Sequence, residues 1–249
     1  LPVQYFLPLI GWRAIFLSIA ALTIICIILV VIFIPGWASK SIPNEQLNEN
    51  KLSTVWKNSL FISLVPMGFF TYGGLFAIQT LWAGPWMIRV AGYTPLESAQ
   101  GLFIIYLSML ISFFCWGYFV PKFSKNINDA IRWLKFGAPI NLIVLAIIIY
   151  LGPKAGSIHW AIFIVSSIFL SLAHPAVGMA FSLSNAGKAL TSFNLLLFIG
   201  AFFMQWVMGL IIDAGMSFNL SEINSFKLAM IFVFITSLFS YFFFIKKVK

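Results

Sequence analysis

Side chains that could do chemistry are scarce in the apolar segments of this chain. The central parts of these segments contain no Asp, Glu, Lys or Arg, and one histidine, His174, lies just past the middle of one of them. This imidazole could bind a substrate, exchange a proton, or donate to the carbonyl oxygen of Ser171, because Pro175 has no backbone N–H to serve that oxygen. Proton or ion coupling usually needs a buried charged group, so we expect these segments not to supply it.

Three of the apolar segments also carry polar and aromatic residues at helical spacing. Residues seven positions apart return to within about 20° on an α-helix, so they share a face. Stripes of this kind either line a substrate cavity or hydrogen-bond neighbouring helices, each bond contributing about 0.6 to 2 kcal/mol. The candidates for a cavity are Tyr72, Phe76, Gln79, His174, Asn194, Phe198 and Gln205.

The two interpretations are weighed differently for large and small side chains. For Gln79, Asn194 and Gln205 both stay open, because an amide group needs several hydrogen-bond partners. Trp206 either lines the cavity or faces lipid. For the smaller residues we favour helix packing, and these are Ser167, Ser171, Gly178 and Thr191.

Signatures of enzymes are missing from the sequence. It has no catalytic triad, phosphate-binding loop, metal-ligand cluster or dinucleotide fingerprint, and only six Asp and Glu and two His in 249 residues. The two cysteines, Cys26 and Cys115, lie in different apolar segments without metal or redox spacing. We therefore expect no enzyme, no cofactor and no metal site.

The elements that must position these residues are membrane helices. The chain is 61% hydrophobic and 8% charged, which leaves too little polar surface to coat a water-soluble globule. A helix needs about 20 apolar residues to cross about 30 Å of hydrocarbon, and seven such runs fill most of the chain. Open strand edges are not stable in lipid. The sequence therefore predicts an all-α membrane protein, a polytopic bundle of seven transmembrane helices.

Proline and glycine residues mark the spans that are expected to bend. Pro66, Gly73 and Gly74 weaken the hydrogen-bond ladder of the second span, and Pro175 interrupts the fifth. The predicted spans run from about Trp12 to Ile34, Leu60 to Trp82, Ala99 to Val120, Leu134 to Leu151, Ile158 to Leu183, Thr191 to Ile212 and Phe226 to Ile245.

A polar stretch, residues 36 to 57, separates the first span from the other six. Eleven Lys and Arg lie in connections on the same side of the membrane as this stretch, and four lie on the other side. The positive-inside rule therefore predicts that the stretch and the C-terminus face the cytoplasm. We expect the protein in the inner or plasma membrane of the cell. The net charge of +9 is then explained by topology, with the lipid bilayer as partner and no nucleic acid. Because the chain opens at Leu1 on an apolar stretch, we expect a fragment whose residues 1 to 10 are the exit of an earlier span.

The order of these features resembles the major facilitator superfamily of transporters. Gly11-Trp12-Arg13 before an apolar span, a cytoplasmic stretch of about twenty residues and six further spans are similar to the second part of that family, whose two six-helix halves are joined by a long connection. The resemblance implies three parts: residues 1–35 as the end of the N-terminal half, 36–57 as the linker between halves, and 58–249 as the C-terminal six-helix bundle. Five preceding helices are then absent.

Two more stretches carry the resemblance. Gly117, Pro121 and Lys122 stand where the family repeats a G-x-x-x-D-[RK] motif between its eighth and ninth helices, with Pro121 in place of the acid. Residues 185 to 213 are similar to the family's tenth-to-eleventh helix region. The resemblance implies secondary transport of a small solute by alternating access, with the stripe-bearing spans lining the central cavity and any proton or ion coupling in the missing half. Aromatic and amide side chains and one His suit a small, amphipathic or neutral solute.

Other membrane functions remain open from the sequence. Seven spans with an outside N-terminus also describe a complete seven-helix receptor or sensor, although the last span has no Lys that could hold retinal and no paired outer cysteines are present. A membrane subunit that does not itself transport is a third alternative.

Overall fold

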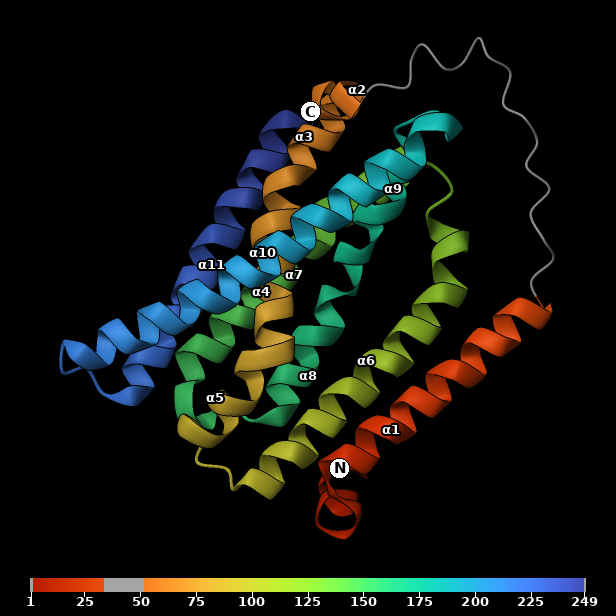
Figure 1. The fold of residues 1–249 in the computed structure, drawn as a ribbon. Helices are drawn as coiled ribbons and strands as arrows, with labels where there is room; N and C mark the ends of the chain where they lie inside the picture. Colours follow the sequence, from red (N-terminus) through yellow and green to blue (C-terminus); the bar gives the residue numbers. More distant parts are fainter. Residues whose placement is uncertain (1, 34–51, 249) are drawn as a thin grey trace. The chain divides into compact units, whose positions relative to one another are not determined.

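A computed structural model describes residues 2–33 and 52–248 of the chain, with side chains from Phe6 onward in the first of these ranges. The chain divides into two units, Leu1–Leu47 and Asn48–Lys249, which are considered separately. The described residues are helical almost throughout and contain no strand (Figure 1). Seven helices are long and apolar enough to cross a membrane, which confirms the prediction of an all-helical chain with seven candidate spans.

The first unit holds a single long helix, α1 (Pro2–Phe33). Its backbone leaves the helical region at Gly11, where φ is 74° and ψ is 163°. This positive φ suits glycine, and it breaks the helix one residue before Trp12, where the first span is predicted to begin. Residues 34–51, most of the predicted linker, lie outside the described ranges.

The second unit begins with a short helix, α2 (Leu52–Lys57), formed by the last six residues of the predicted linker. Its Val55 is fully buried, so this end of the linker belongs to the packed unit. The second span follows as one unbroken helix in which α-helical and π-helical segments alternate. Its N-cap is Asn58, whose side chain accepts a hydrogen bond from the N–H of Phe61. The segments are α3 (Ser59–Pro66), η2 (Met67–Tyr72), α4 (Gly73–Ala77), η3 (Ile78–Trp82) and α5 (Ala83–Arg89).

Two of these segments, η2 and η3, are π-helical. A π-bulge inserts extra backbone into an α-helix and is frequent at functional sites. The segment η3 ends three residues before Pro85, whose missing N–H leaves a carbonyl of the preceding turn unpaired. Through α5 the second span continues seven residues beyond Trp82, where its hydrophobic run suggests that it stops.

The next two spans have well-formed caps. Helix α6 (Pro95–Phe123) starts with a capping box between Thr94 and Glu97, and α7 (Ile127–Leu151) starts with Asn126, which accepts from the N–H of Asp129. Helix α7 begins seven residues before the predicted Leu134, because this cap starts the helix in polar sequence ahead of the hydrophobic run. It ends at Gly152, with a φ of 55°, and a short 3-10 turn, η4 (Gly152–Lys154), follows.

The fifth and sixth spans also differ from the predicted boundaries. The fifth consists of α8 (Ser157–Ser166), the 3-10 segment η5 (Ser167–Leu172) and α9 (Ala173–Met179), so it ends before Leu183. Leu183 is instead the first residue of α10 (Leu183–Ser217), eight residues ahead of the predicted start at Thr191. Three residues are enough for the turn, and polar residues such as Lys188 form the first turns of α10. The final helix is α11 (Glu222–Lys247).

The six spans of the second unit pack into one bundle (Figure 1). Helix α10 packs against α11, α4 and η2; α6 packs against α8; and α7 packs against η5, α8 and α11. The largest fully buried side chains include Trp86, Trp160, Phe61, Phe163 and Phe193. The bundle thus has an aromatic core contributed by several spans.

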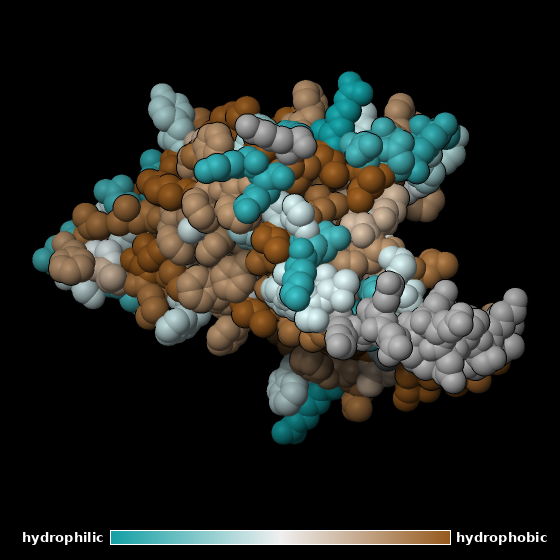
Figure 2. All heavy atoms as spheres, turned by 90° about the horizontal axis from the view of Figure 1, so that it is seen from above, coloured by the Kyte–Doolittle hydropathy of each residue, from teal (hydrophilic) through white to brown (hydrophobic). Residues whose placement is uncertain are grey.

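Charge is distributed unequally between the two ends of this bundle. The end at which α3 starts and α11 finishes carries Asp129 as its one described acidic residue, and Figure 2 shows hydrophilic side chains among hydrophobic ones on this face. The opposite end carries equal numbers of described cations and acidic residues. The cations are Arg89, Lys154 and Lys227, and the acidic residues are Glu97, Asp213 and Glu222. We call the first the basic end; its described cations are Lys57, Lys122, Lys125, Arg132, Lys135, Lys188, Lys246 and Lys247.

Candidate functional site

The structure brings together the most reactive members of the three predicted stripes. Nε2 of His174, on α9, lies 2.9 Å from Oδ1 of Asn194 on α10. The Asn194 atom is a carbonyl oxygen, so Nε2 of His174 is the donor of this bond. The ring of Tyr72, on η2, meets the His174 ring edge-on, with centroids 5.8 Å apart. His174 is therefore held between the second and sixth spans.

Two aromatic rings fix the orientation of this imidazole. Besides Tyr72, Phe193 of α10 packs edge-on against His174 with a centroid distance of 5.3 Å. Phe193 is fully buried, and Tyr72 is 6% exposed. The hydroxyl of Tyr72 is buried without a hydrogen-bond partner, and a buried polar group of this kind costs free energy. It is thus a donor beside His174 that no described side chain uses.

Gln205 is placed farther along α10 and bonds to the second span. Its Nε2 donates to Oγ1 of Thr80 at 2.8 Å, and its backbone carbonyl accepts from Nε1 of Trp82 at 3.3 Å. Between Gln205 and the His174 group, the rings of Phe76 and Phe198 face each other with centroids 6.5 Å apart. The stripes on the second and sixth spans therefore meet along much of their length.

Gln79 takes a different direction from the other candidates. Its Nε2 donates to the sulfur of Met109, on α6, at 2.8 Å, and its backbone carbonyl accepts from the hydroxyl of Tyr106 at 2.7 Å. Gln79 thus joins the second span to the third and is not part of the group around His174.

The smaller stripe residues mainly satisfy their own helices. Ser167 donates to the carbonyl of Ile164 in α8, and Ser171 donates to the carbonyl of Ile168 in η5, each at 2.6 Å. Ser171 also accepts from Nε1 of Trp116 at 3.1 Å. Gly178 faces Leu190, whose nearest side-chain atom would lie 3.7 Å from an added Cβ. These contacts are those of helix packing, and the 3-10 segment η5 leads directly into the His174-Pro175 pair.

The glycines that are predicted to allow bending lie at close helix crossings. A Cβ atom on Gly73 would be 2.5 Å from the carbonyl carbon of Gly200, and one on Gly74 would be 2.6 Å from Cγ1 of Val233. Their positions thus have a packing reason in addition to any flexibility. Pro66 ends α3 immediately before the π-helical segment η2, and Pro175 lies in the first turn of α9.

The loop motif between the third and fourth spans contains no ion pair among the described residues. Gly117, Pro121 and Lys122 all lie in the last two turns of α6 and are exposed. The Lys122 ammonium group sits 3.8 Å from the centre of the Tyr118 ring. Lys122 therefore makes a cation–π contact with Tyr118. It follows Pro121, which stands where the motif of the transporter family has an acid.

Two polar contacts inside the bundle are not visible as stripes in the sequence. Asn141 of α7 is buried and donates to the carbonyl of Phe163 and to Oγ of Ser166, each at 2.9 Å. Thr71 of η2 and Ser240 of α11 are both buried, with their hydroxyl oxygens 2.6 Å apart. Asn141 and Thr71 have no polar residue three, four or seven positions away on their own helices, so helical spacing could not single them out.

The face formed by α9 and α10 around the candidate residues is open in this unit. Asn194 is exposed, and Phe198 and Trp206 are 67% and 58% exposed. Asn194 and Gln205 lie six and five residues from Gly200, the middle of α10, so they are within about 9 Å of the centre of that helix. We call this surface the polar face, and define it by His174, Asn194, Phe198, Gln205 and Trp206.

The chemistry available at the polar face is hydrogen bonding and aromatic contact. Within the described ranges no group of three or more His, Cys, Asp or Glu could hold a metal ion. Asn194, His174 and Tyr72 offer an amide, an imidazole and a phenol within one cluster, which suits a neutral polar ligand. Comparison of the chain with models of protein families, with curated proteins and with solved structures gave no match.

Proposed function

We propose that the six spans of the second unit form one bundle of a secondary transporter that moves a small solute by alternating access, as in the major facilitator superfamily. The polar face is then one wall of the solute path. The basic end faces the cytoplasm, in keeping with the positive-inside rule.

One observation carries this proposal: hydrogen-bonding side chains, Asn194 exposed and Gln205 half-buried, lie near the middle of a helix whose central part is otherwise apolar. An amide or imidazole facing hydrocarbon is costly, so such residues usually face a bundle interior or a water-filled cavity. Asn194 and Gln205 are about half-way along the 35-residue helix α10, so a bilayer crossed by this helix would surround them with hydrocarbon. A second bundle and a water-filled path between the two would cover them.

The second span supplies a means of moving this wall. Two π-helical segments flank Gly73 and Gly74, and the interrupted hydrogen-bond ladder of such segments allows a helix to bend at small cost. Tyr72 ends the first π-helical segment and contacts His174. Bending there would change the distance between the Tyr72 hydroxyl and the imidazole, and so couple the helix to solute binding.

Uptake or efflux by the full-length protein in proteoliposomes tests the proposal directly. A panel of neutral, amphipathic and charged solutes is measured with and without a pH gradient. We expect a small neutral or amphipathic solute to cross, and His174→Ala and Gln205→Ala to impair its transport without loss of membrane insertion.

Thr236→Ala is the matched control for these variants. Thr236 of α11 donates only to carbonyl oxygens of its own helix, those of Phe232 and Val233, so its loss should leave transport unchanged. Normal transport kinetics in both His174→Ala and Gln205→Ala would show that the polar face does not line the solute path. Absence of transport across the whole panel, from protein that is inserted and folded, would contradict the transporter itself.

A further inference from the structure

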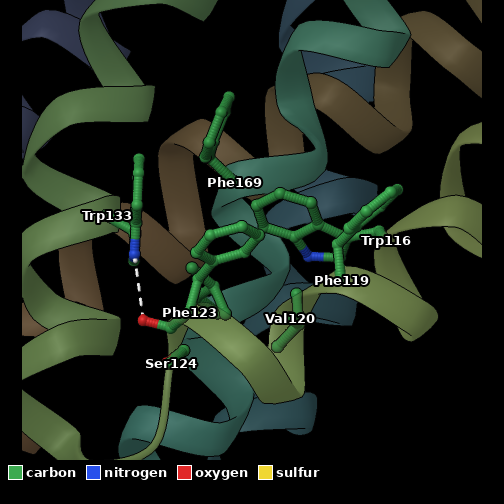
Figure 3. A pocket seen from close by; sticks show the side chains of 8 residues that line it. Trp116, Phe119, Val120, Phe123, Ser124, Trp133 and Phe169 are labelled. Atoms are coloured by element: carbon green, nitrogen blue, oxygen red, sulfur yellow. Dashed lines mark hydrogen bonds between the residues drawn. The ribbon is translucent and has the colours of Figure 1, made fainter.

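A second possible binding site lies away from the polar face, at the basic end of the bundle. The rings of Trp116, Phe119, Phe123, Trp133 and Phe169 gather around a hollow between α6, α7 and η5 (Figure 3). The cavity measures about 280 Å³. This is less than the roughly 300 to 1,000 Å³ of pockets that enclose whole drug-sized ligands, so it suits one part of a longer molecule.

The lining of this hollow is almost entirely carbon, although two indoles contribute to it. Nε1 of Trp116 donates to Oγ of Ser171 at 3.1 Å, and Nε1 of Trp133 donates to the carbonyl of Phe123 at 3.3 Å. Trp133 and Phe169 stack with their planes 19° apart. Because both indole donors are already bonded, the hollow has nothing to offer a polar solute, and a hydrocarbon chain fits its surface.

The depth of the hollow matches the upper part of a lipid leaflet. Trp133 is six residues after Ile127, the first residue of α7, which places it about 9 Å below the helix end. Trp116 is seven residues before the end of α6 at Phe123. Measured from a helix end at the membrane surface, both distances exceed the roughly 5 to 8 Å of the headgroup region, so both rings would reach the first acyl carbons.

Cationic side chains border the hollow on its outer side. Trp133 also lines a neighbouring open depression together with Arg132, Lys135 and Phe136, so one indole separates the carbon-lined hollow from two cations. Among the described residues no carboxylate pairs with Arg132 or Lys135; Lys135 donates to the backbone carbonyl of Val248. The nearest acid in sequence, Asp129, accepts from the backbone N–H of Lys125.

We propose that this region binds an anionic phospholipid, with part of an acyl chain in the carbon-lined hollow and the headgroup phosphate at Arg132 and Lys135. Lys135 starts deeper on α7 than Trp133, but its ammonium group reaches back to the carbonyl of Val248, beyond the end of α11. The carbon-lined hollow and these cations, which no carboxylate pairs among the described residues, are complementary to the two ends of one such molecule. The site is independent of the proposed solute path, and its ligand stays in the membrane.

Native mass spectrometry of the whole chain in detergent can test this assignment. The chain is titrated with phosphatidylglycerol, with phosphatidylcholine of the same acyl chains, and with glycerol 3-phosphate. We expect phosphatidylglycerol to bind most tightly and glycerol 3-phosphate only weakly. Arg132→Gln and Lys135→Gln should each lower the affinity for phosphatidylglycerol about five-fold, and together about 25-fold, since a cation near an anionic headgroup contributes about 1 kcal/mol.

Two further variants test separately how the cations and the hollow contribute to phospholipid binding. Lys154→Gln removes an exposed cation at the opposite end and should leave binding unchanged. Val120→Phe fills the hollow, which Val120 lines, and should weaken both phospholipids while circular dichroism shows unchanged helix content. Equal binding of the two phospholipids, an Arg132→Gln/Lys135→Gln variant that keeps its preference, or Val120→Phe without effect would overturn the proposal. Glycerol 3-phosphate binding as tightly as the lipid would show a free-phosphate site instead.

Discussion

Gly73 and Gly200 face each other where the second and sixth spans cross, with no room for a side chain on either. A Cβ atom on Gly73 would lie 2.5 Å from the carbonyl carbon of Gly200, and one on Gly200 would overlap the carbonyl of Phe69. Small residues at such crossings let helix backbones approach closely in membranes. This crossing holds α4 against α10, and so positions Tyr72 beside His174.

Gly200→Ala should therefore destabilise the bundle even though alanine favours helices. Forcing a methyl group into a packed backbone contact typically costs about 1 to 3 kcal/mol, and here the contact is with backbone atoms that cannot rotate away. The measurement is the free energy of unfolding in mixed detergent micelles, followed by circular dichroism.

Gly187→Ala is the matched control on the same helix. Nothing lies within 4 Å of a Cβ atom built at Gly187, so this change should leave stability the same or raise it by up to about 1 kcal/mol, the helix-propensity difference between the two residues. Equal effects of the two substitutions would show that the crossing at Gly200 is looser than the structure has it.

The double variant of His174 and Asn194 should lose less unfolding free energy than the sum of the losses in the two single variants. The two residues are joined by one contact of 2.9 Å, so the variants His174→Ala, Asn194→Ala and the double variant form a thermodynamic cycle. Interhelical hydrogen bonds in membranes average about 0.6 and reach about 1.7 kcal/mol, and we expect a coupling free energy in that range from unfolding measurements. Strictly additive effects would mean that the imidazole and amide do not interact in the membrane.

Tyr72→Phe separates stability from function. The Tyr72 hydroxyl is buried without a partner, so its removal abolishes a desolvation penalty, and stability should stay the same or rise by about 1 to 3 kcal/mol. If the hydroxyl donates to the solute, transport should fall in the same variant.

Tyr106→Phe is the comparison for Tyr72→Phe. The Tyr106 hydroxyl donates to the carbonyl of Gln79 at 2.7 Å, so its removal should lower stability, by about 0.5 to 1.5 kcal/mol. Unfolding curves and transport rates of both variants decide the matter. A marked loss of stability in Tyr72→Phe would indicate that its hydroxyl has a partner.

The number of spans followed from the lengths of the apolar runs, whereas their ends did not. Hydrophobicity does not detect a helix that starts in polar sequence, and α10 begins at Leu183 after Ser182, eight residues before its hydrophobic part. Capping residues carry that information locally. One such signal is Asn126, the N-cap of α7, whose side-chain oxygen accepts a hydrogen bond from the N–H of Asp129.

Helical spacing identified which residues share a face but not which faces meet. It grouped Gln79 with Tyr72, yet a π-helical segment begins at Ile78, and Gln79 bonds to Met109 on α6. A π-turn adds residues to the helical repeat, so residues on either side of it no longer keep the α-helical angle. The contact of Tyr72 with His174 needs no such correction, because it depends on how two helices pack.

Asn141 shows what a pattern-based search misses, and its substitution should destabilise the bundle. The amide joins α7 to α8 through two bonds of 2.9 Å and is 4% exposed. Asn141→Leu keeps the number and branching of the side-chain heavy atoms but leaves the Phe163 carbonyl with one partner fewer, and we expect a loss of about 1 to 2 kcal/mol in unfolding free energy. Asn224→Leu, at an exposed position in the first turn of α11, should change stability by less than about 0.5 kcal/mol. Similar values for both would mean that the buried amide does not hold the two spans together.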